Sequence, residues 1–374
     1  MRPALLLCIF IAPFFPAYVF GQTIAHNEIV PVYSGNSSSA VMYDALAPGL
    51  AALYANPAAA VRSDETFLFD SSFWTIGDFS SVFSSGFSAL GDSDLVARFA
   101  DEIIDLQSDQ PLGGGMATAV GSTGSGLNAA LELIARLSGG GDSVYAAVHE
   151  IQLTAHIGWV ESWEIAGGQL SGSVQLRPLI RTFTGIPDTG FDELLPTLSG
   201  TALPLDVGIF WQKGSYSLGA FARNISGPKL YYTLNSYELV LRSLTHDFGV
   251  PVHNNADSAD IQAYLDGKEY YIPPVYGFSA MKDFVFSEDW LKGQLTGGAW
   301  LRDESLPEMD FDFTFGWNAS FRMLFGQGVS CFAGLSDAGM HAGAAAQIGI
   351  FSVSTAWYNM ELASGMQLHL SFQL

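Results

Sequence analysis

The residues that decide the fold run from Glu308 to Phe325, EMDFDFTFGWNASFRMLF. Apolar side chains occupy every odd position from Met309 onward, and acidic, hydroxyl, amide and other non-apolar residues occupy nearly all the even ones. Such an alternation puts the two sets on opposite faces of a β-strand. Soluble strands are typically ~5–6 residues long, so an aromatic face about three times that length suits lipid better. The stretch therefore predicts a membrane-crossing strand with water on its polar face, as in a transmembrane β-barrel.

The composition of the whole chain agrees with this interpretation. Of the 374 residues, 49% are hydrophobic and only 14% are charged, with 40 glycines and 13% aromatic residues. Beyond the N-terminal segment, no apolar run reaches the ~18 residues that a membrane-spanning helix needs. Glycine and aromatic residues fit a barrel wall with aromatic girdles at the two interfaces. The net charge of −22 excludes nucleic acid as an expected partner, because phosphate would be repelled.

The first 21 residues have the pattern of a secretory signal. Arg2 precedes an apolar segment from Ala4 to Phe15, and small residues follow near Gly21, where we expect cleavage. An uncleaved anchor is the alternative. Because Cys8 lies within the signal, Cys331 would be the sole cysteine of the mature chain, and no internal disulfide is expected.

The remaining chain divides into a plug, or hatch, at 22–62 and a β-barrel at 63–374. The plug region ends in small apolar residues interrupted by Pro48 and Pro57, which favour short helical turns over a long helix or a strand. Such a compact segment ahead of a barrel is expected to sit in the lumen or beneath it.

Strand patterns are most regular after Tyr145, and the chain offers 12 to 14 candidates. Bacterial barrels use even numbers, so we predict 14 antiparallel strands. Lys213-Gly214, between two alternating runs, predicts a hairpin. Apolar residues at helical spacing predict helices at Asp94–Leu106 and Leu127–Leu137, around a possible glycine-rich strand. We expect helical insertions at about 94–137 and 231–272, outside the membrane.

Three segments resemble a known family. APGLAALYANPA, from Ala47 to Ala58, resembles the hatch segment of the FadL-type outer-membrane transporter superfamily, which includes PorV-like and TraF-like proteins. The stretch from Pro204 to Ile225 resembles its mid-barrel hairpin, and the last 50 residues resemble its final strands. Two features depart from the pattern. The chain ends on Leu374 rather than on an aromatic residue, and the helices predicted within 94–137 resemble the TraF-like or spirochaetal branches more closely.

The resemblance implies a 14-stranded barrel in the outer membrane of a didermal, Gram-negative-type bacterium, with a hatch that occludes the lumen. It implies transport of hydrophobic small molecules, such as long-chain fatty acids. Expected partners are outer-membrane lipids, the hydrophobic ligand and the barrel assembly machinery during insertion. The alternatives are a non-transporting scaffold that binds a periplasmic or surface protein in a secretion or conjugation system, and a general porin.

No enzymatic site, metal site or cofactor is expected. The sequence has seven histidines but no Gly-x-Ser-x-Gly motif, so we interpret the histidines as lumen or loop residues. Even-numbered carboxylates near the mouth predict an acidic strip on the lumen wall, which would favour cations or merely be solvated. This strip consists of Glu308, Asp310 and Asp312.

The plug contains the residues that we expect to matter for transport. Asn56 can satisfy the backbone of a turn through its side chain, and Pro57 fixes φ. With Ala58 they would set one bend that a ligand displaces, unless they only terminate a helix. The apolar residues just before them would touch a hydrophobic ligand or simply pack against the wall. These ligand-contact candidates are Leu50, Leu53 and Tyr54.

Overall fold

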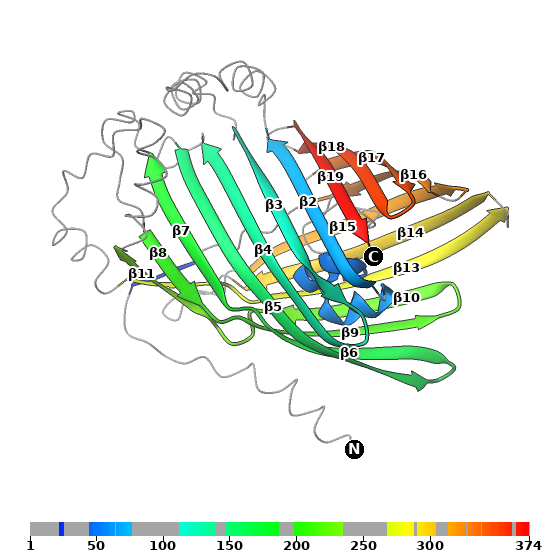
Figure 1. The fold of residues 1–374 in the computed structure, drawn as a ribbon, viewed down its shortest axis with the longest axis horizontal. Coiled ribbons are helices and arrows are strands. Elements are labelled where there is room, and N and C mark those ends of the chain that lie inside the picture. Colours follow the sequence, from blue (N-terminus) through cyan, green and yellow to red (C-terminus); the bar gives the residue numbers. More distant parts are fainter. Residues whose placement is uncertain are drawn as a thin grey trace.

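The fold is a β-barrel that encloses two short helices (Figure 1). The computed structural model describes residues 22–25, 45–63, 65–76, 112–139, 147–186, 198–234, 268–287, 290–303, 313–326, 328–337, 339–360 and 364–373. Its strands are β1 (Gln22–Ala25), β2 (Glu65–Ile76), β3 (Leu112–Thr123), β4 (Gly126–Gly139), β5 (Ala147–Ile165), β6 (Gly168–Leu176), β7 (Leu179–Ile186), β8 (Leu198–Ala202), β9 (Leu205–Lys213), β10 (Tyr216–Arg223), β11 (Lys229–Leu234), β12 (Lys268–Tyr271), β13 (Val275–Ser287), β14 (Leu291–Asp303), β15 (Phe313–Phe325), β16 (Val329–Ser336), β17 (Gly339–Ile348), β18 (Phe351–Met360) and β19 (Ser364–Gln373).

These strands close into an antiparallel barrel of 14 strands, as predicted. Four of the barrel strands are broken into two segments each, namely β6 with β7, β8 with β9, β10 with β11, and β12 with β13. Each strand pairs with the next, and β19 pairs with β2 from Gly365 opposite Ile76 to Gln373 opposite Leu68. This last pairing leaves no free edge between the first and last strands of the barrel. The short strand β1 pairs in parallel with β12.

Prolines lie at all four breaks, at Pro178, Pro204, Pro228 and Pro273-Pro274. Proline has no N–H to donate to a neighbouring strand, so the hydrogen-bond ladder stops there. Backbone hydrogen bonds still join neighbouring strands at these breaks. One of them runs from the N–H of Arg177 to the carbonyl of Pro204, at 2.9 Å. The ladder is therefore interrupted at one level across four adjacent strands.

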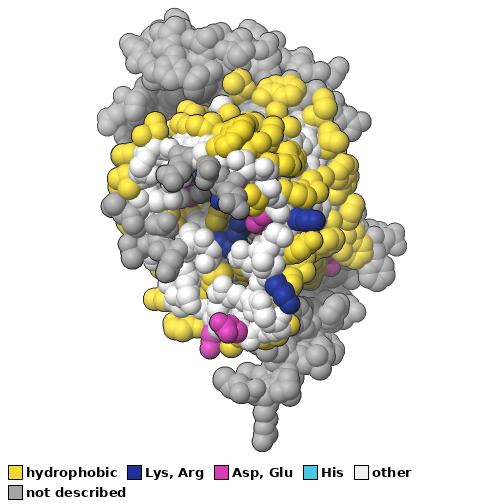
Figure 2. All heavy atoms as spheres, turned by 90° about the vertical axis from the view of Figure 1, so that its right-hand side faces the viewer, with side chains coloured by type: hydrophobic (Ala, Val, Ile, Leu, Met, Phe, Trp, Pro, Cys, Tyr) yellow, Lys and Arg dark blue, Asp and Glu magenta, His cyan; other side chains and the backbone are white. Residues whose placement is uncertain are grey.

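The barrel has apolar side chains outside and polar side chains inside. On β15, Phe315 is 60% exposed on the outer face, whereas Ser320 on the inner face is 3% exposed. Figure 2 views the molecule from the end of the short turns, and hydrophobic side chains cover much of the outer surface. Lys and Arg side chains lie in the hollow at the centre of this view. This arrangement matches a wall between lipid and a polar lumen.

The two ends of the barrel differ in the length of their connections. Turns of two or three residues join β3 to β4, β5 to β6, β9 to β10, β13 to β14, β15 to β16 and β17 to β18 at one end. The predicted hairpin at Lys213 is among them, and Gly214 has φ of +57°, a value that glycine adopts without strain. The connections at the other end include 77–111 and 235–267. Bacterial barrels have short periplasmic turns and longer extracellular loops.

The prediction of a helix at Leu127–Leu137 is wrong, because these residues belong to strand β4. Leu127 and Leu131 fit a helical spacing, but with Leu133 they also fit a spacing of two, and all three are exposed on the outer face. Glu132, between two of them, is buried in the lumen. The glycine-rich strand was predicted correctly and is β3. The helix predicted at Asp94–Leu106 lies outside the described residues, as does most of the insertion predicted at 231–272. No helix in the described ranges is long and apolar enough to cross a membrane.

Residues 45–63 lie inside the barrel, nearer to the short turns than to the other end (Figure 1). They form two 3₁₀ helices, η2 (Gly49–Tyr54) and η3 (Pro57–Arg62), joined through Ala55 and Asn56. These are short turns punctuated by proline, as the sequence indicated. We refer to residues 45–63 as the plug.

Candidate functional site: the plug and the lumen wall around it

The plug is held mainly by small apolar side chains against inward apolar residues of the wall. Alanines of η3 pack with Val160 of β5, Phe210 of β9 and Met281 of β13. On other sides of the plug, Tyr54 packs with Trp74 and Ile134. Apolar side chains of the wall therefore line the places where the plug touches it.

Asn56 links two parts of the plug and fixes the plug to strand β9. Its side chain is fully buried, and its Nδ2 donates to the carbonyls of Ala45 and of Ile209 on β9, each at 2.9 Å. Its Oδ1 accepts the N–H of Ala58 at 3.2 Å and so caps η3, with Pro57 at the first helical position. Asn56 thus both caps a helix and binds the wall.

Two wall glycines leave room for this contact. A Cβ at Gly208 of β9 would lie 2.0 Å from Oδ1 of Asn56, and a Cβ at Gly219 of β10 would lie 2.4 Å from the carbonyl oxygen of Ala45. Any side chain at either position would overlap the plug. The glycines therefore form a socket for Asn56, which we call the Asn56 socket.

The three ligand-contact candidates all face the wall in this plugged state. Leu50 and Leu53 are buried against Leu68, Ala119 and Ala130. Tyr54 lies edge-on to the imidazole of His156, with ring centroids 4.8 Å apart. Contact with a ligand therefore requires that the plug move, so their role remains a prediction. The acidic strip of Glu308, Asp310 and Asp312 lies outside the described residues.

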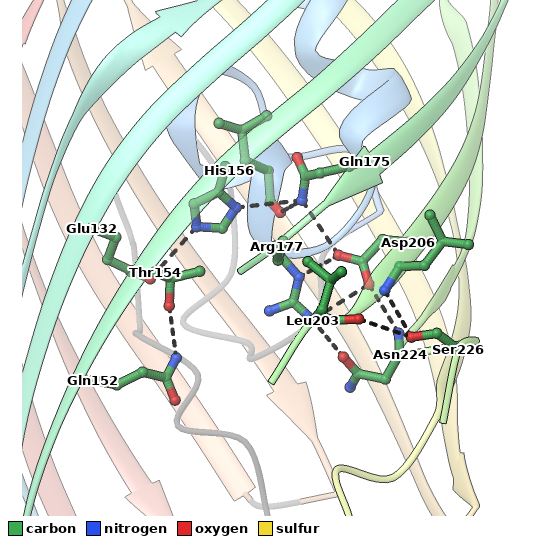
Figure 3. A network of polar contacts seen from close by, with 12 residues as sticks. Glu132, Gln152, Thr154, His156, Gln175, Arg177, Leu203, Asp206, Asn224 and Ser226 are labelled. Atoms are coloured by element: carbon green, nitrogen blue, oxygen red, sulfur yellow. Dashed lines mark hydrogen bonds and ion pairs between the residues drawn. The ribbon is translucent and has the colours of Figure 1, made fainter. Parts of the chain in front are cut away.

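A polar network connects the plug to the wall (Figure 3). Nε2 of Gln175 on β6 donates to the plug carbonyl of Leu53 at 2.8 Å. The same nitrogen lies 3.3 Å from Nδ1 of His156 and 3.3 Å from Oδ2 of Asp206. On the far side of the imidazole, Nε2 of His156 lies 3.7 Å from the carboxylate of Glu132. Gln175 is therefore the residue through which the plug, β5 and β9 meet.

The same network continues to the proline breaks. The guanidinium of Arg177 is bonded to the carboxylate of Asp206 and, at 2.5 Å, to Oδ1 of Asn224. Asn224 in turn donates its backbone N–H to Asp206 at 2.9 Å and its side-chain amide to the carbonyl of Pro273 at 3.0 Å. All three side chains are at most 1% exposed. They tie together the strands whose ladders the prolines interrupt, and we call them the break latch.

A second ion cluster lies on the other side of the breaks. The carboxylate of Glu150 on β5 is bonded to the guanidinium groups of Arg136 on β4 and Arg181 on β7. Glu150 and Arg181 are each 1% exposed. Buried charges of this kind need partners, which they have here. No group of three or more metal-ligating side chains occurs among the described residues.

Sequence reasoning found the plug but missed the side chains that bind it. Gln175, Arg177 and Asp206 stand at polar positions of alternating runs, where they look like ordinary lumen residues. The signal that marks them is the proline just after Arg177 and again two residues before Asp206. A buried charge beside a proline that breaks a strand needs a partner nearby. Matching Arg177 with Asp206, the charged residues next to such prolines, would have predicted the break latch.

Comparison with known proteins finds similar structures but no matching sequence family. No family model matches the sequence, and no curated protein is significantly similar to it. Among solved structures, a Pseudomonas aeruginosa FadL homologue has 12% identity and a TM-score of 0.44, over 87% of this chain and 94% of that chain. The Ralstonia pickettii toluene transporter TbuX has 8% identity and a TM-score of 0.43, over 87% and 92%.

The structure is also similar to a barrel of another kind. The translocator domain of the autotransporter NalP from Neisseria meningitidis has 10% identity and a TM-score of 0.39, over 84% of this chain and 89% of that chain. All three matches are similarities of structure at low sequence identity. The function has to be argued from the lumen of this chain.

Proposed function

We propose that this protein is an outer-membrane channel for hydrophobic small molecules, closed at rest by the plug. The observation that carries the proposal is the apolar surface inside the lumen. Large inward side chains of six different strands contact the plug, and they are Trp74, Ile134, Phe210, Phe221, Met281 and Trp300. The lumen of a general porin is polar and filled with water, so this apolar surface favours a hydrophobic solute.

Polar bonds join the plug to the wall at separate points. They include those of Asn56 with Ile209, of the Leu53 carbonyl with Gln175, of the Ala45 N–H with Ser279 at 3.1 Å, and of Ser63 with Thr123 at 3.0 Å. Between these bonds the plug makes apolar contacts with the wall. A hydrophobic molecule that occupied the same wall residues would replace those contacts, whereas water would not. Long-chain fatty acids are the ligands that the resemblance of the hatch segment implies.

Uptake by intact cells tests the proposal. The full chain is expressed in a bacterium with an outer membrane, and entry of radiolabelled oleate is compared with that in cells that express a variant lacking residues 26–58. We expect uptake above the vector control with the full chain, changed rates with the deletion, and little ion conductance of the full chain in planar bilayers.

The alternatives give different results. A steady, high conductance of the full chain indicates a general porin. No uptake of oleate or of a labelled aromatic hydrocarbon, together with low conductance, overturns the proposal and indicates a scaffold.

A further inference from the structure

Inward aromatic rings of the barrel lie against glycines of the adjacent strand. Trp74 stands opposite Gly115, Phe221 opposite Gly277, Trp300 opposite Gly316, Phe332 opposite Gly343, and Tyr358 opposite Gly365. A Cβ built at any of these five glycines would lie 2.1–2.4 Å from an atom of the opposing ring. Cross-strand packing of an aromatic ring over glycine is a known device in β-sheets. The rings therefore occupy the space that the missing side chains leave along the wall.

The plug rests on some of these rings. Phe221 and Trp300 pack with Ala45 and Ala55 of the plug, and both rings are buried, at 5% and 6% exposure. Each ring thus has a glycine on its wall side and belongs to a cluster that includes plug alanines. We call Phe221, Trp300 and their two glycines the plug seat.

We propose that Gly277 and Gly316 are positioning residues that set how deeply the plug sits and so keep the barrel closed. This inference rests on the proposed function, in which the plug is the closing element. A Cβ at Gly316 would meet Trp300 atoms at 2.2–2.4 Å, whereas ordinary contact begins at 3.4 Å. The ring would have to move by at least 3.4 − 2.2 = 1.2 Å. The two backbones are held in register by their ladder, so the movement is directed toward the lumen and the plug.

A plug that leaves its seat can be detected as an increase in ion conductance. On the strands β15 to β19, many inward side chains are small and polar, including Ser320, Ser330, Ser354 and Ser371. Such a wall supports water once the plug no longer closes the lumen. A plug lifted from its seat therefore opens an aqueous path, and ions report it without any hydrophobic ligand.

The test measures the open fraction of the full chain in planar bilayers for Gly316→Ala and Gly277→Ala. Because overpacking is a common cause of destabilisation, we expect the open fraction to rise by about tenfold. Gly297→Ala on β14 is the matched control, because a Cβ there would meet only the Asn318 carbonyl oxygen, at 3.6 Å, and it should behave as the wild type. Heat-dependent migration on gels confirms that each variant is a folded barrel.

A double variant separates the seat from general damage. Trp300→Leu is measured alone and together with Gly316→Ala. The ring that the new methyl group would push is then absent, so Gly316→Ala should raise the open fraction no further than Trp300→Leu does alone. The inference is overturned if a folded Gly316→Ala barrel stays closed, or if Gly316→Ala raises the open fraction about tenfold in the Trp300→Leu chain as well. If the wild type took up no oleate, the proposed function would be wrong, but the inference from the conductance of the glycine variants would still hold.

Discussion

Replacing Asn56 by alanine tests most sharply how the plug is held. The change removes two donated bonds of 2.9 Å and one accepted bond of 3.2 Å, and it leaves two carbonyl oxygens and one N–H in a buried site. Only the bond to Ile209 crosses from the plug to the wall. Leaving that buried carbonyl without its donor should cost the seated state roughly 1–3 kcal/mol. The ratio of unseated to seated plug should then rise roughly 5- to 150-fold.

Single-channel recording of Asn56→Ala measures this ratio as the open fraction. Asn128→Ala is the matched control, because Asn128 is also buried and makes three bonds, to the N–H and carbonyl of Gly124 and to the carbonyl of Gly126. It holds the β3–β4 turn and does not touch the plug through these bonds. Asn56→Asp keeps the acceptor but loses the two donors, and it should also open. The reasoning is refuted if Asn56→Ala conducts as the wild type, or if Asn128→Ala opens the barrel equally.

Two further changes test the wall. Asp206→Ala leaves the guanidinium of Arg177 buried without its carboxylate, so the free energy of unfolding in urea should fall by ~3–5 kcal/mol. The double variant Arg177→Met with Asp206→Leu should regain most of this loss. A loss below about 1 kcal/mol for Asp206→Ala would argue against the break latch. Phe321→Arg, at an outward position near the middle of β15, should cost ~2–4 kcal/mol of unfolding free energy, because this face lies in lipid. Glu161→Arg, which is exposed on β5 close to a short turn, should change stability by no more than ~0.5 kcal/mol. Equal effects of these two changes would contradict the placement of the middle of β15 in lipid.

The fold follows from alternation because lipid and water select side chains on opposite faces of every strand. Phe315 and Ser320 show how plainly β15 obeys this rule. Leu127 and Leu131 show where it is ambiguous, because two leucines four residues apart suit a helix face as well as alternate positions of a strand. Leu133 and the buried Glu132 decide for the strand, although the glycines from Gly139 onward also suit the end of a helix.

The site was less accessible to sequence reasoning because it depends on contacts between distant residues. Asn56 was identified through its local role in a turn, but its bond to Ile209 spans 153 positions. The need for glycine at Gly208 and Gly219 arises only when the plug lies against β9 and β10. Periodicity assigns residues to a face of a strand, but it does not say which inward residues meet across the lumen.

Locking the plug in place tests the central claim most directly. Ala45 and Ser279 are joined by a bond of 3.1 Å between N–H and Oγ, so Ala45→Cys with Ser279→Cys, in a chain with Cys331→Ser, places two thiols where plug and wall meet. If hydrophobic molecules pass only when the plug leaves its seat, oxidised cells should take up no more radiolabelled oleate than vector controls, and a reducing agent should restore uptake. Uptake that is the same in the verified disulfide form and in the reduced form would contradict the account.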